Sequence, residues 1–249
     1  MQSIDRAMQI IKVLIKHDPN RFFSITELAK ECDLPTSSMH RILNAMIKHE
    51  MIQQDPQRKL YGLGTLWLEY GLIVYDTLDY VSVLRPELEN LMRNLGATVY
   101  LSRPIGKESI IIERIDCINQ TIHAHDKLGH RTPLHVGAAN LTMLAHMSPN
   151  FVEEVMNEFI PDNERISLHH RLNKIKMDGY ELSHEDQTSG ISSIAAPLLS
   201  HYGGVVGAIS IKLNISHLSE NQLKWTVDEV VNSGNKISWK MGYSTVNFV

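Results

Sequence analysis

Small and long polar side chains gather between residues 36 and 48, and their types suit hydrogen bonding to nucleic acid. Ser37 and Ser38 carry hydroxyl groups, which can contact phosphates. Arg41 and Asn44 carry side chains that can form paired hydrogen bonds to base edges in the major groove of duplex DNA. A basic pair follows further along the chain. The candidate DNA contacts are Thr36, Ser37, Ser38, His40, Arg41, Asn44, Arg58 and Lys59.

Three amphipathic segments must position this polar face. Apolar spacing predicts a first helix that ends before Pro19, a short second helix over 27–31, and a third helix that begins at Pro35. Ser24 or Thr26 can cap the second helix, and Ser24 has the capping-box spacing. The predicted buried stripes are Ile4, Ala7, Met8, Ile11, Leu14 and Ile15 in the first helix, and Met39, Ile42, Leu43, Met46 and Ile47 in the third.

An extended pair, 52–54 and 60–63, follows the third helix and predicts a hairpin with Arg58 and Lys59 at its tip. A polar helix face alone is most often only solvated. The ordered set of three helices, a tight turn and a basic hairpin favours a winged helix-turn-helix over 1–64. Residues 1–62 carry nine Lys and Arg against seven Asp and Glu, whereas the whole chain has a net charge of −4. The first segment is therefore the one suited to phosphates.

Several motifs resemble the isocitrate lyase regulator (IclR) family of bacterial transcription regulators. The family's usual S-V-D-R-A, L-P, S-T-V-H-R-L-L and Y-x-L-G are matched, in order, by Ser3-Ile4-Asp5-Arg6-Ala7, Leu34-Pro35, Ser37-Ser38-Met39-His40-Arg41-Ile42-Leu43 and Tyr61-Gly62-Leu63-Gly64. Where the family usually has a basic residue after L-P, this chain has Thr36. We expect one phosphate contact fewer, and a salt dependence shallower by about one unit of log K per log salt.

Residues 65–79 predict a helix that is apolar almost all round, which needs burial on more than one side. The resemblance implies the family's linker helix, which packs against a partner subunit, and hence a homodimer or a tetramer. An ordinary core helix of one domain remains the alternative.

The remaining residues, 80–249, alternate helical and extended patterns, and we expect an α+β fold with a mainly antiparallel sheet. The resemblance implies a GAF-like effector-binding domain. The expected strands are 98–103, 109–116, 121–124, 192–199 and 205–213, and the expected helices are 81–95, 138–146, 150–158, 164–177 and 219–241.

The resemblance also places an effector pocket in this half. Gly129, Thr132-Pro133-Leu134-His135 and Ala138 are similar to the family's G-x-x-x-P-L-H-x-x-A. Ala138 and Ala139 would offer backbone N–H groups at a helix start, which suits a carboxylate. Lys212 would either pair with an anionic effector or point to solvent. The implied effector contacts are Leu134, Ala138, Ala139, Glu185, Asp186, Ser210 and Lys212.

Asn140-Leu141 stands where the family commonly has G-K, so a constitutive DNA-binding protein with a degenerate pocket is one alternative. An enzyme with an accessory helix-turn-helix is another, but no converging acid, base or nucleophile set can be assembled. We therefore expect a regulator, a repressor controlled by a small organic acid or sugar acid, and no enzyme.

Metal and cofactor chemistry is not favoured. His123 and His125 share a predicted strand face near His130 and His135, but the three or four converging ligands that zinc needs are not apparent. These histidines are expected at the surface or at a pocket rim, and no cofactor is expected. Without a long apolar run or a secretion signal, the sequence predicts a cytoplasmic protein and no membrane partner.

Overall fold

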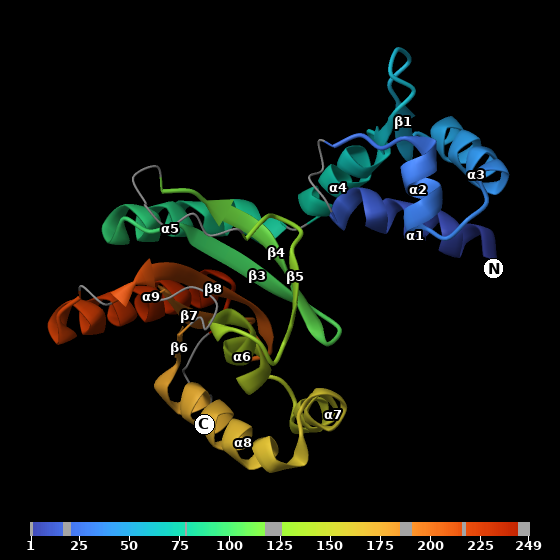
Figure 1. The fold of residues 1–249 in the computed structure, drawn as a ribbon. Coiled ribbons are helices and arrows are strands. Elements are labelled where there is room, and N and C mark those ends of the chain that lie inside the picture. The colour runs from blue at the N-terminus through green and yellow to red at the C-terminus, as the bar shows by residue number, and fades with distance from the viewer. Residues whose placement is uncertain are drawn as a thin grey trace. The chain divides into compact units, whose positions relative to one another are not determined.

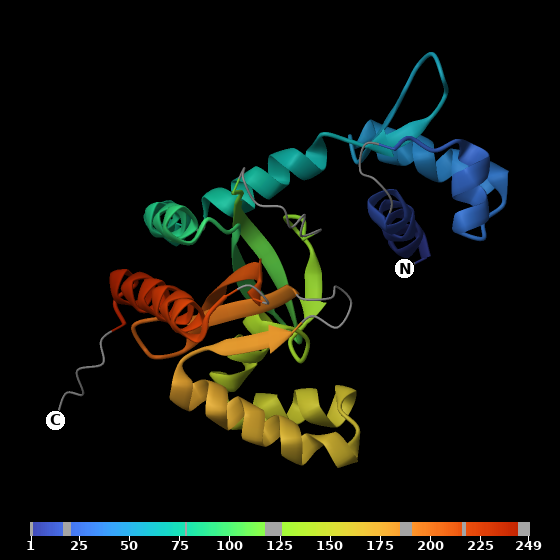
Figure 2. The same cartoon turned by 60° about the vertical axis from the view of Figure 1, so that its left-hand side comes forward.

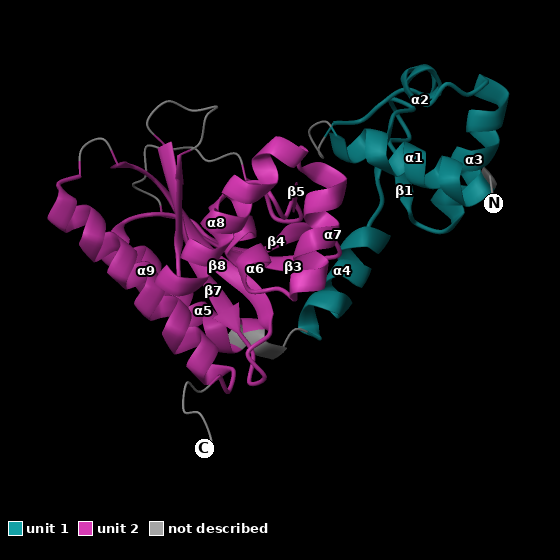
Figure 3. Ribbon diagram, turned by 90° about the horizontal axis from the view of Figure 1, so that it is seen from below, with its two compact units in different colours: residues 1–79 teal, residues 80–249 magenta. Residues whose placement is uncertain are grey.

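The structure is a computed structural model that describes residues 2–16, 21–77, 79–117, 126–184, 191–215 and 218–243. The chain divides into two compact units, Met1–Asp79 (unit 1) and Tyr80–Val249 (unit 2), coloured separately in Figure 3. No helix among the described residues is long and apolar enough to cross a membrane.

Unit 1 is a helical core followed by a small hairpin and one further helix (Figure 1). The hairpin strands pair antiparallel, with Ile52 opposite Leu63. Phe23 makes an isolated bridge to Tyr61, which ties the segment before the second helix to the hairpin. The elements are α1 (Gln2–Lys16), α2 (Ile25–Glu31), α3 (Thr36–Lys48), β1 (Ile52–Gln54), β2 (Tyr61–Leu63) and α4 (Leu66–Asp76).

The boundaries of α2 and α3 follow from their capping residues. Ser24 caps α2 in a full capping box: its hydroxyl accepts from the Glu27 N–H, and the Glu27 carboxylate accepts from the Ser24 N–H. The capping-box prediction is confirmed, although α2 starts at Ile25 rather than at Glu27. Pro35 is the residue before α3 rather than its first residue. The winged helix-turn-helix is confirmed.

The predicted stripe of α1 is partly wrong. Ile4 is 75% exposed and Ile15 is 55% exposed, whereas Ile10, which was not assigned to the stripe, is fully buried. Ile10, Ile11 and Leu14 form the buried side, because this face meets Leu28, Met39 and Leu43 in one core cluster. Periodicity alone did not show which of two overlapping apolar faces the core would cover.

Unit 2 is an α+β domain whose strands all pair antiparallel among the described residues, which confirms the predicted fold class. The larger sheet has the strand order β5-β4-β3-β8-β7-β6. The helices are α5 (Asp79–Leu95), α6 (Ala138–Ala145), α7 (Pro149–Phe159), α8 (Asp162–Asp178) and α9 (Glu220–Lys240). The strands are β3 (Val99–Ile105), β4 (Glu108–Ile115), β5 (Arg131–Pro133), β6 (Glu181–His184), β7 (Ile191–Leu199) and β8 (Val205–Asn214).

Each face of this sheet has its own helical layer, and in Figure 2 α9 (red) and the α7–α8 pair (yellow) lie on opposite sides of it. Leu88 of α5 and Val230 of α9 pack with Val99, Leu101 and other strand residues into one apolar cluster. On the other face, Leu144 of α6 and Val155 of α7 belong to a second cluster. Side chains alternate between the two faces along a strand. The strand residues next in sequence to those of the first cluster therefore point toward α6.

Most expected elements of unit 2 are found within three residues of their predicted ends. The short strands β5 and β6 were not predicted, because three or four residues carry too little alternation to be recognised. The strand expected over 121–124 lies outside the described residues.

Candidate DNA interface and ligand cavity

The exposed face of α3 carries the polar residues that the sequence singled out. Met39, Leu43 and Met46 are buried in the core of unit 1, whereas Ile42 and Ile47 are half-buried. The opposite face is turned to solvent. Its exposed residues are Thr36, Ser37, His40, Arg41, Asn44 and Lys48, and Ser38 is half-buried.

The N-terminus of α3 is suited to a phosphate. Pro35 provides no side-chain cap and the first turn contains no acidic residue. The first backbone N–H groups of the helix therefore keep their partial positive charge for an external acceptor. Thr36 and Ser37 are exposed at this end, so their hydroxyls can contribute hydrogen bonds to the same phosphate.

The turn between β1 and β2 is held by Asp55, which places Arg58 and Lys59 at its exposed end. The Asp55 carboxylate accepts hydrogen bonds from the N–H groups of Gln57 (2.9 Å) and Arg58 (3.0 Å). The bonds from Arg58 and Gln57 hold the pKa of Asp55 below its ordinary value. Lys59 has a φ of 56°, in the left-handed region, and its N–H donates to the Asp55 carbonyl oxygen (2.9 Å). The basic pair is thus set in a defined turn.

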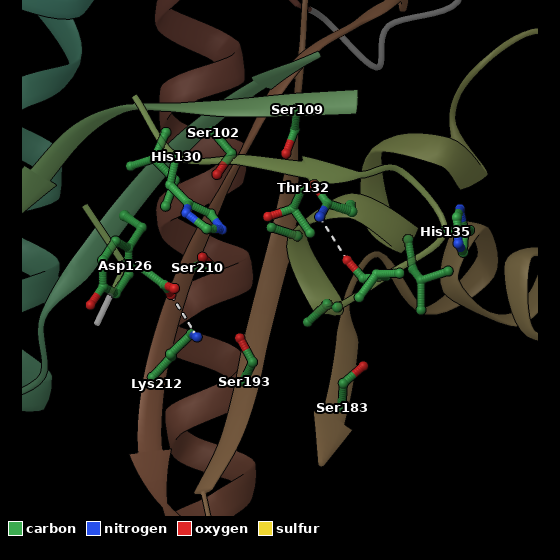
Figure 4. Close-up of a pocket in the computed structure, with 18 of the residues that line it drawn as sticks. Ser102, Ser109, Asp126, His130, Thr132, His135, Ser183, Ser193, Ser210 and Lys212 are labelled. Carbon is green, nitrogen blue, oxygen red and sulfur yellow. Dashed lines mark hydrogen bonds and ion pairs between the residues drawn. The ribbon is translucent and has the colours of Figure 1, made fainter. Parts of the chain in front are cut away.

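Unit 2 contains a cavity of about 560 Å³ between the α6 face of the sheet and α6 itself. Figure 4 shows side chains from several strands converging on it. Its lining includes Ala138, Ala139, Ser210 and Lys212, four of the predicted effector contacts. Leu134 is not among the lining residues: it is fully buried in the cluster formed with α6 and α7, so its prediction was wrong. Glu185 and Asp186 lie outside the described residues.

The cavity end of α6 is another uncapped helix N-terminus. Gly137 precedes the helix with φ 85°, a conformation that other residues rarely adopt, and gives it no side-chain cap. The first turn has no acidic residue. Asn140 lines the cavity, and its Nδ2 donates to the Val136 carbonyl oxygen (2.6 Å), so the side chain folds back on the turn before the helix. The cavity remains open although Asn140-Leu141 replaces the family's usual G-K.

Lys212 is mostly buried, and its ammonium group is already paired with a carboxylate of the protein. Its Nζ lies 2.6 Å from Oδ2 of Asp126, and the two side chains are 17% and 26% exposed. A second cation on the cavity wall, Arg171, is also ion-paired: its guanidinium contacts the Glu181 carboxylate and donates to the Ser183 hydroxyl (2.8 Å). The cavity cations are therefore balanced by protein carboxylates.

Two of the histidines weighed as metal ligands, His130 and His135, line the cavity instead. His135 stacks on Phe159 with ring centroids 5.2 Å apart, and burial lowers its pKa. Within the described part of the chain, no group of three or more His, Cys, Asp or Glu could hold a metal ion. His123 and His125 lie outside that part.

Several cavity residues were not predicted from the sequence, namely Ser102, Ser109, Asp126, Arg171 and Ser193. The serines carried no clear signal, because their sequence neighbours are mixed: Ser102 precedes the exposed Arg103, Ser109 follows Glu108 and Ser193 follows Ser192. Asp126 and Arg171 had none, since only the folded chain brings them to the cavity wall.

Comparison with known proteins identifies both units. Residues 3–56 match the IclR helix-turn-helix domain, and residues 73–239 match the family described as bacterial transcriptional regulator IclR C-terminal. The chain belongs to the IclR family. It is therefore a DNA-binding transcriptional regulator, and not an enzyme.

Similar full-length proteins support this assignment. The chain is 25% identical to the HTH-type transcriptional regulator KipR of Bacillus subtilis and 26% identical to XynR of Escherichia coli, and in both cases the alignment covers 98% of each chain. An IclR homologue from Microbacterium hydrocarbonoxydans, solved in complex with 4-hydroxybenzoate, superposes with a TM-score of 0.81 at 19% identity and covers 96% of this chain and 98% of its own. At this identity the likeness concerns the fold alone.

Proposed function

We propose that this regulator is a repressor that binds operator DNA through α3 and the β1–β2 turn, and whose affinity is set by a small carboxylate in unit 2. The observation that carries the proposal is the exposed polar face of α3 beside an uncapped helix N-terminus. Arg41 and Asn44 would contact base edges, and Arg58 and Lys59 would contact phosphates beside them. Residues 1–64 would form the DNA-binding part, 65–79 the linker and 80–249 the effector-binding part, and the protein would act in the cytoplasm.

The effector carboxylate would bind at the N-terminus of α6. The N–H groups of Ala138 and Ala139 belong to the first turn of a helix without a capping side chain or an acidic residue, and both residues line the cavity. Such a terminus favours an anion. The complex of a related protein with 4-hydroxybenzoate, a carboxylate, supports this class of ligand. Ser210 and Lys212 would contact the rest of the molecule, and Glu185 and Asp186 stay part of the proposal.

A homodimer, or a tetramer built from it, would present two copies of α3 to a pseudo-palindromic site. The support comes from α4, in which no residue is buried and Leu68, Leu72 and Ile73 are more than half exposed. An apolar helix left uncovered within unit 1 needs a second surface, which a partner subunit would supply. Sedimentation velocity checks this: Ile73→Glu should lower the assembly state, whereas Glu69→Gln on the same helix should leave it unchanged. A wild-type monomer would contradict the dimer.

The decisive experiment measures binding of the purified protein to fragments of its own promoter region at low salt, with and without a panel of small carboxylates. A ligand that acts through unit 2 should change the affinity about five- to a hundredfold, the usual size of such coupling. Absence of any preferred fragment would refute the proposed operator binding. Preferred binding that no carboxylate changes would refute only the effector control.

A further inference from the structure

Buried hydroxyl groups that have no hydrogen-bond partner among the described residues line the cavity. Ser102, Ser109 and Ser210 are only 5%, 3% and 5% exposed, and each lines the cavity. No hydrogen bond joins these hydroxyls to another described residue. Because buried polar groups are almost always hydrogen-bonded, these side chains are set to bond to whatever fills the cavity.

The sheet register places the cavity serines on one face of the sheet, which forms the polar floor of the cavity. Ser210 on β8 pairs with Tyr100 on β3, and Lys212 pairs with Ser193 on β7. Ser193 pairs in turn with Ser183 on β6. Since neighbouring strands share a pleat, paired residues project from the same face. The hydroxyls labelled in Figure 4 therefore come from adjacent strands with fixed backbones rather than from a loop.

The Asp126–Lys212 pair lies at one side of this floor (Figure 4). The Asp126 carbonyl oxygen accepts a hydrogen bond from the Arg114 guanidinium (3.1 Å), which ties this residue to β4 beside Lys212. A ligand carboxylate placed on Lys212 would therefore meet the Asp126 carboxylate and be repelled. A ligand hydroxyl suits the pair better, since it can donate to the carboxylate and accept from the ammonium group.

The rest of the wall offers little to a flat apolar ligand. Its aliphatic side chains among the described residues are Ile111, Val136 and Leu141 with two alanines, and its rings in that part of the chain are the Tyr100 phenol and the imidazoles of His130 and His135, of which His135 already stacks on Phe159. Binding an aromatic acid here would leave the serine hydroxyls desolvated and unpaired.

We propose that the cavity takes a polyhydroxylated monocarboxylate of the aldonic acid type, with Asp126 as a specificity-determining residue that accepts a hydrogen bond from a ligand hydroxyl. The proposal rests on the effector role of this cavity and specifies its ligand class. The carboxylate occupies the N-terminus of α6, and the hydroxyls of the carbon chain satisfy Ser102, Ser109, Ser210 and the Asp126–Lys212 pair.

A matched ligand series tests the class on the full chain by calorimetric titration. The probes are D-gluconate and the one-carbon-shorter D-ribonate, against D-glucitol, which lacks the carboxylate, and hexanoate, which lacks the hydroxyls. At least one aldonate should bind ten times or more tightly than glucitol and hexanoate. Binding of hexanoate or 4-hydroxybenzoate in preference to both aldonates overturns the proposal, as does the absence of binding by either aldonate.

Asp126→Asn tests the specificity residue, with Asp162→Asn as its control. Asp162 is also ion-paired to an arginine but lies outside the cavity and is 89% exposed. Loss of a hydrogen bond to a charged acceptor should weaken aldonate binding about ten- to a hundredfold in Asp126→Asn and leave Asp162→Asn unchanged. If Asp126→Asn instead tightens gluconate and hexanoate alike, Lys212 is the carboxylate site and the proposal is wrong.

Ser210→Ala keeps the test valid if Asp126→Asn fails to fold. It should weaken aldonate binding severalfold without changing the much weaker binding of hexanoate, and equal weakening of both would count against the hydroxyl contact. Promoter binding is measured separately on the same preparations. A protein that binds its promoter but no aldonate refutes the ligand class alone, whereas one that fails to bind DNA refutes the proposed regulator mechanism.

Discussion

Arg41 lies on the exposed face of α3, where its guanidinium has no protein role in the core. If it contacts a base edge, Arg41→Ala should weaken binding to the preferred promoter fragment by about 1–3 kcal/mol and leave binding to random DNA nearly unchanged. Fluorescence anisotropy on both DNAs measures the difference. Lys174→Ala, an exposed cation on α8 of unit 2, serves as the control. Equal losses on both DNAs would reassign Arg41 to phosphate contact.

His146 makes the stability of unit 2 depend on pH. Burial holds its pKa below the ordinary value of 6.5, although Nδ1 donates to the Thr142 carbonyl oxygen (2.9 Å). The unfolded chain therefore binds a proton more readily than the folded chain, and stability is lost as the pH falls through 6.5 toward the folded-state pKa. Thermal unfolding between pH 7.5 and pH 5 should show a smaller loss in His146→Gln than in the wild type. His170→Gln, at an exposed position of α8, should behave as the wild type does.

Predictability from sequence differs sharply between the two sites at this scale. The proposed DNA contacts on α3 are local, since the periodicity of one helix separates the buried Met39 and Leu43 from the exposed Arg41 and Asn44. The cavity joins residues far apart in the chain, such as Asp126 and Lys212, and their ion pair depends on tertiary structure that no spacing encodes. Leu134 shows the converse failure, because a motif match identified its segment but not the direction of its side chain.

At the scale of elements, the hairpin and α3 are joined through a close backbone contact at Gly64. A Cβ added there would lie 1.9 Å from the Glu50 carbonyl oxygen. Gly64→Ala should therefore destabilise unit 1 by about 2 kcal/mol or more, because the backbone must shift. Gly71→Ala is the matched control: no described residue lies within 4 Å of its added Cβ, and alanine favours the helix by about 0.5–1 kcal/mol. Chemical denaturation followed by tryptophan fluorescence, to which Trp67 contributes from unit 1, compares the two, and equal stabilities would contradict the close contact.

Long amphipathic elements were predictable and short ones were not. The spans of α5 and α9 follow from sustained apolar periodicity, and the span of α8 follows from its end signals Pro161 and Gly179, whereas β5 and β6 are held by pairing with β4 and β7. For α1, two apolar faces competed, and only the packing against α2 and α3 decided between Ile4 and Ile10.

At the scale of the whole molecule, the apolar cores of the two units are formed by separate sets of residues. Scanning calorimetry of the full chain should therefore show two transitions rather than one. A cavity ligand should raise only the transition of unit 2, by mass action on its folded state. Gly64→Ala should lower only the other. A single transition that moves as a whole under both changes would contradict independent cores.

The alternation along β8 has a consequence for how such regulators diversify. Ile209 and Ile211 anchor the apolar core, while Ser210 and Lys212, one position away in each case, face the cavity. Substitutions at every second position of β8 can therefore change which ligand the cavity recognises, while the apolar core of unit 2 is preserved. A laboratory that wished to build a biosensor for a new compound would vary those alternate positions and hold the intervening isoleucines constant.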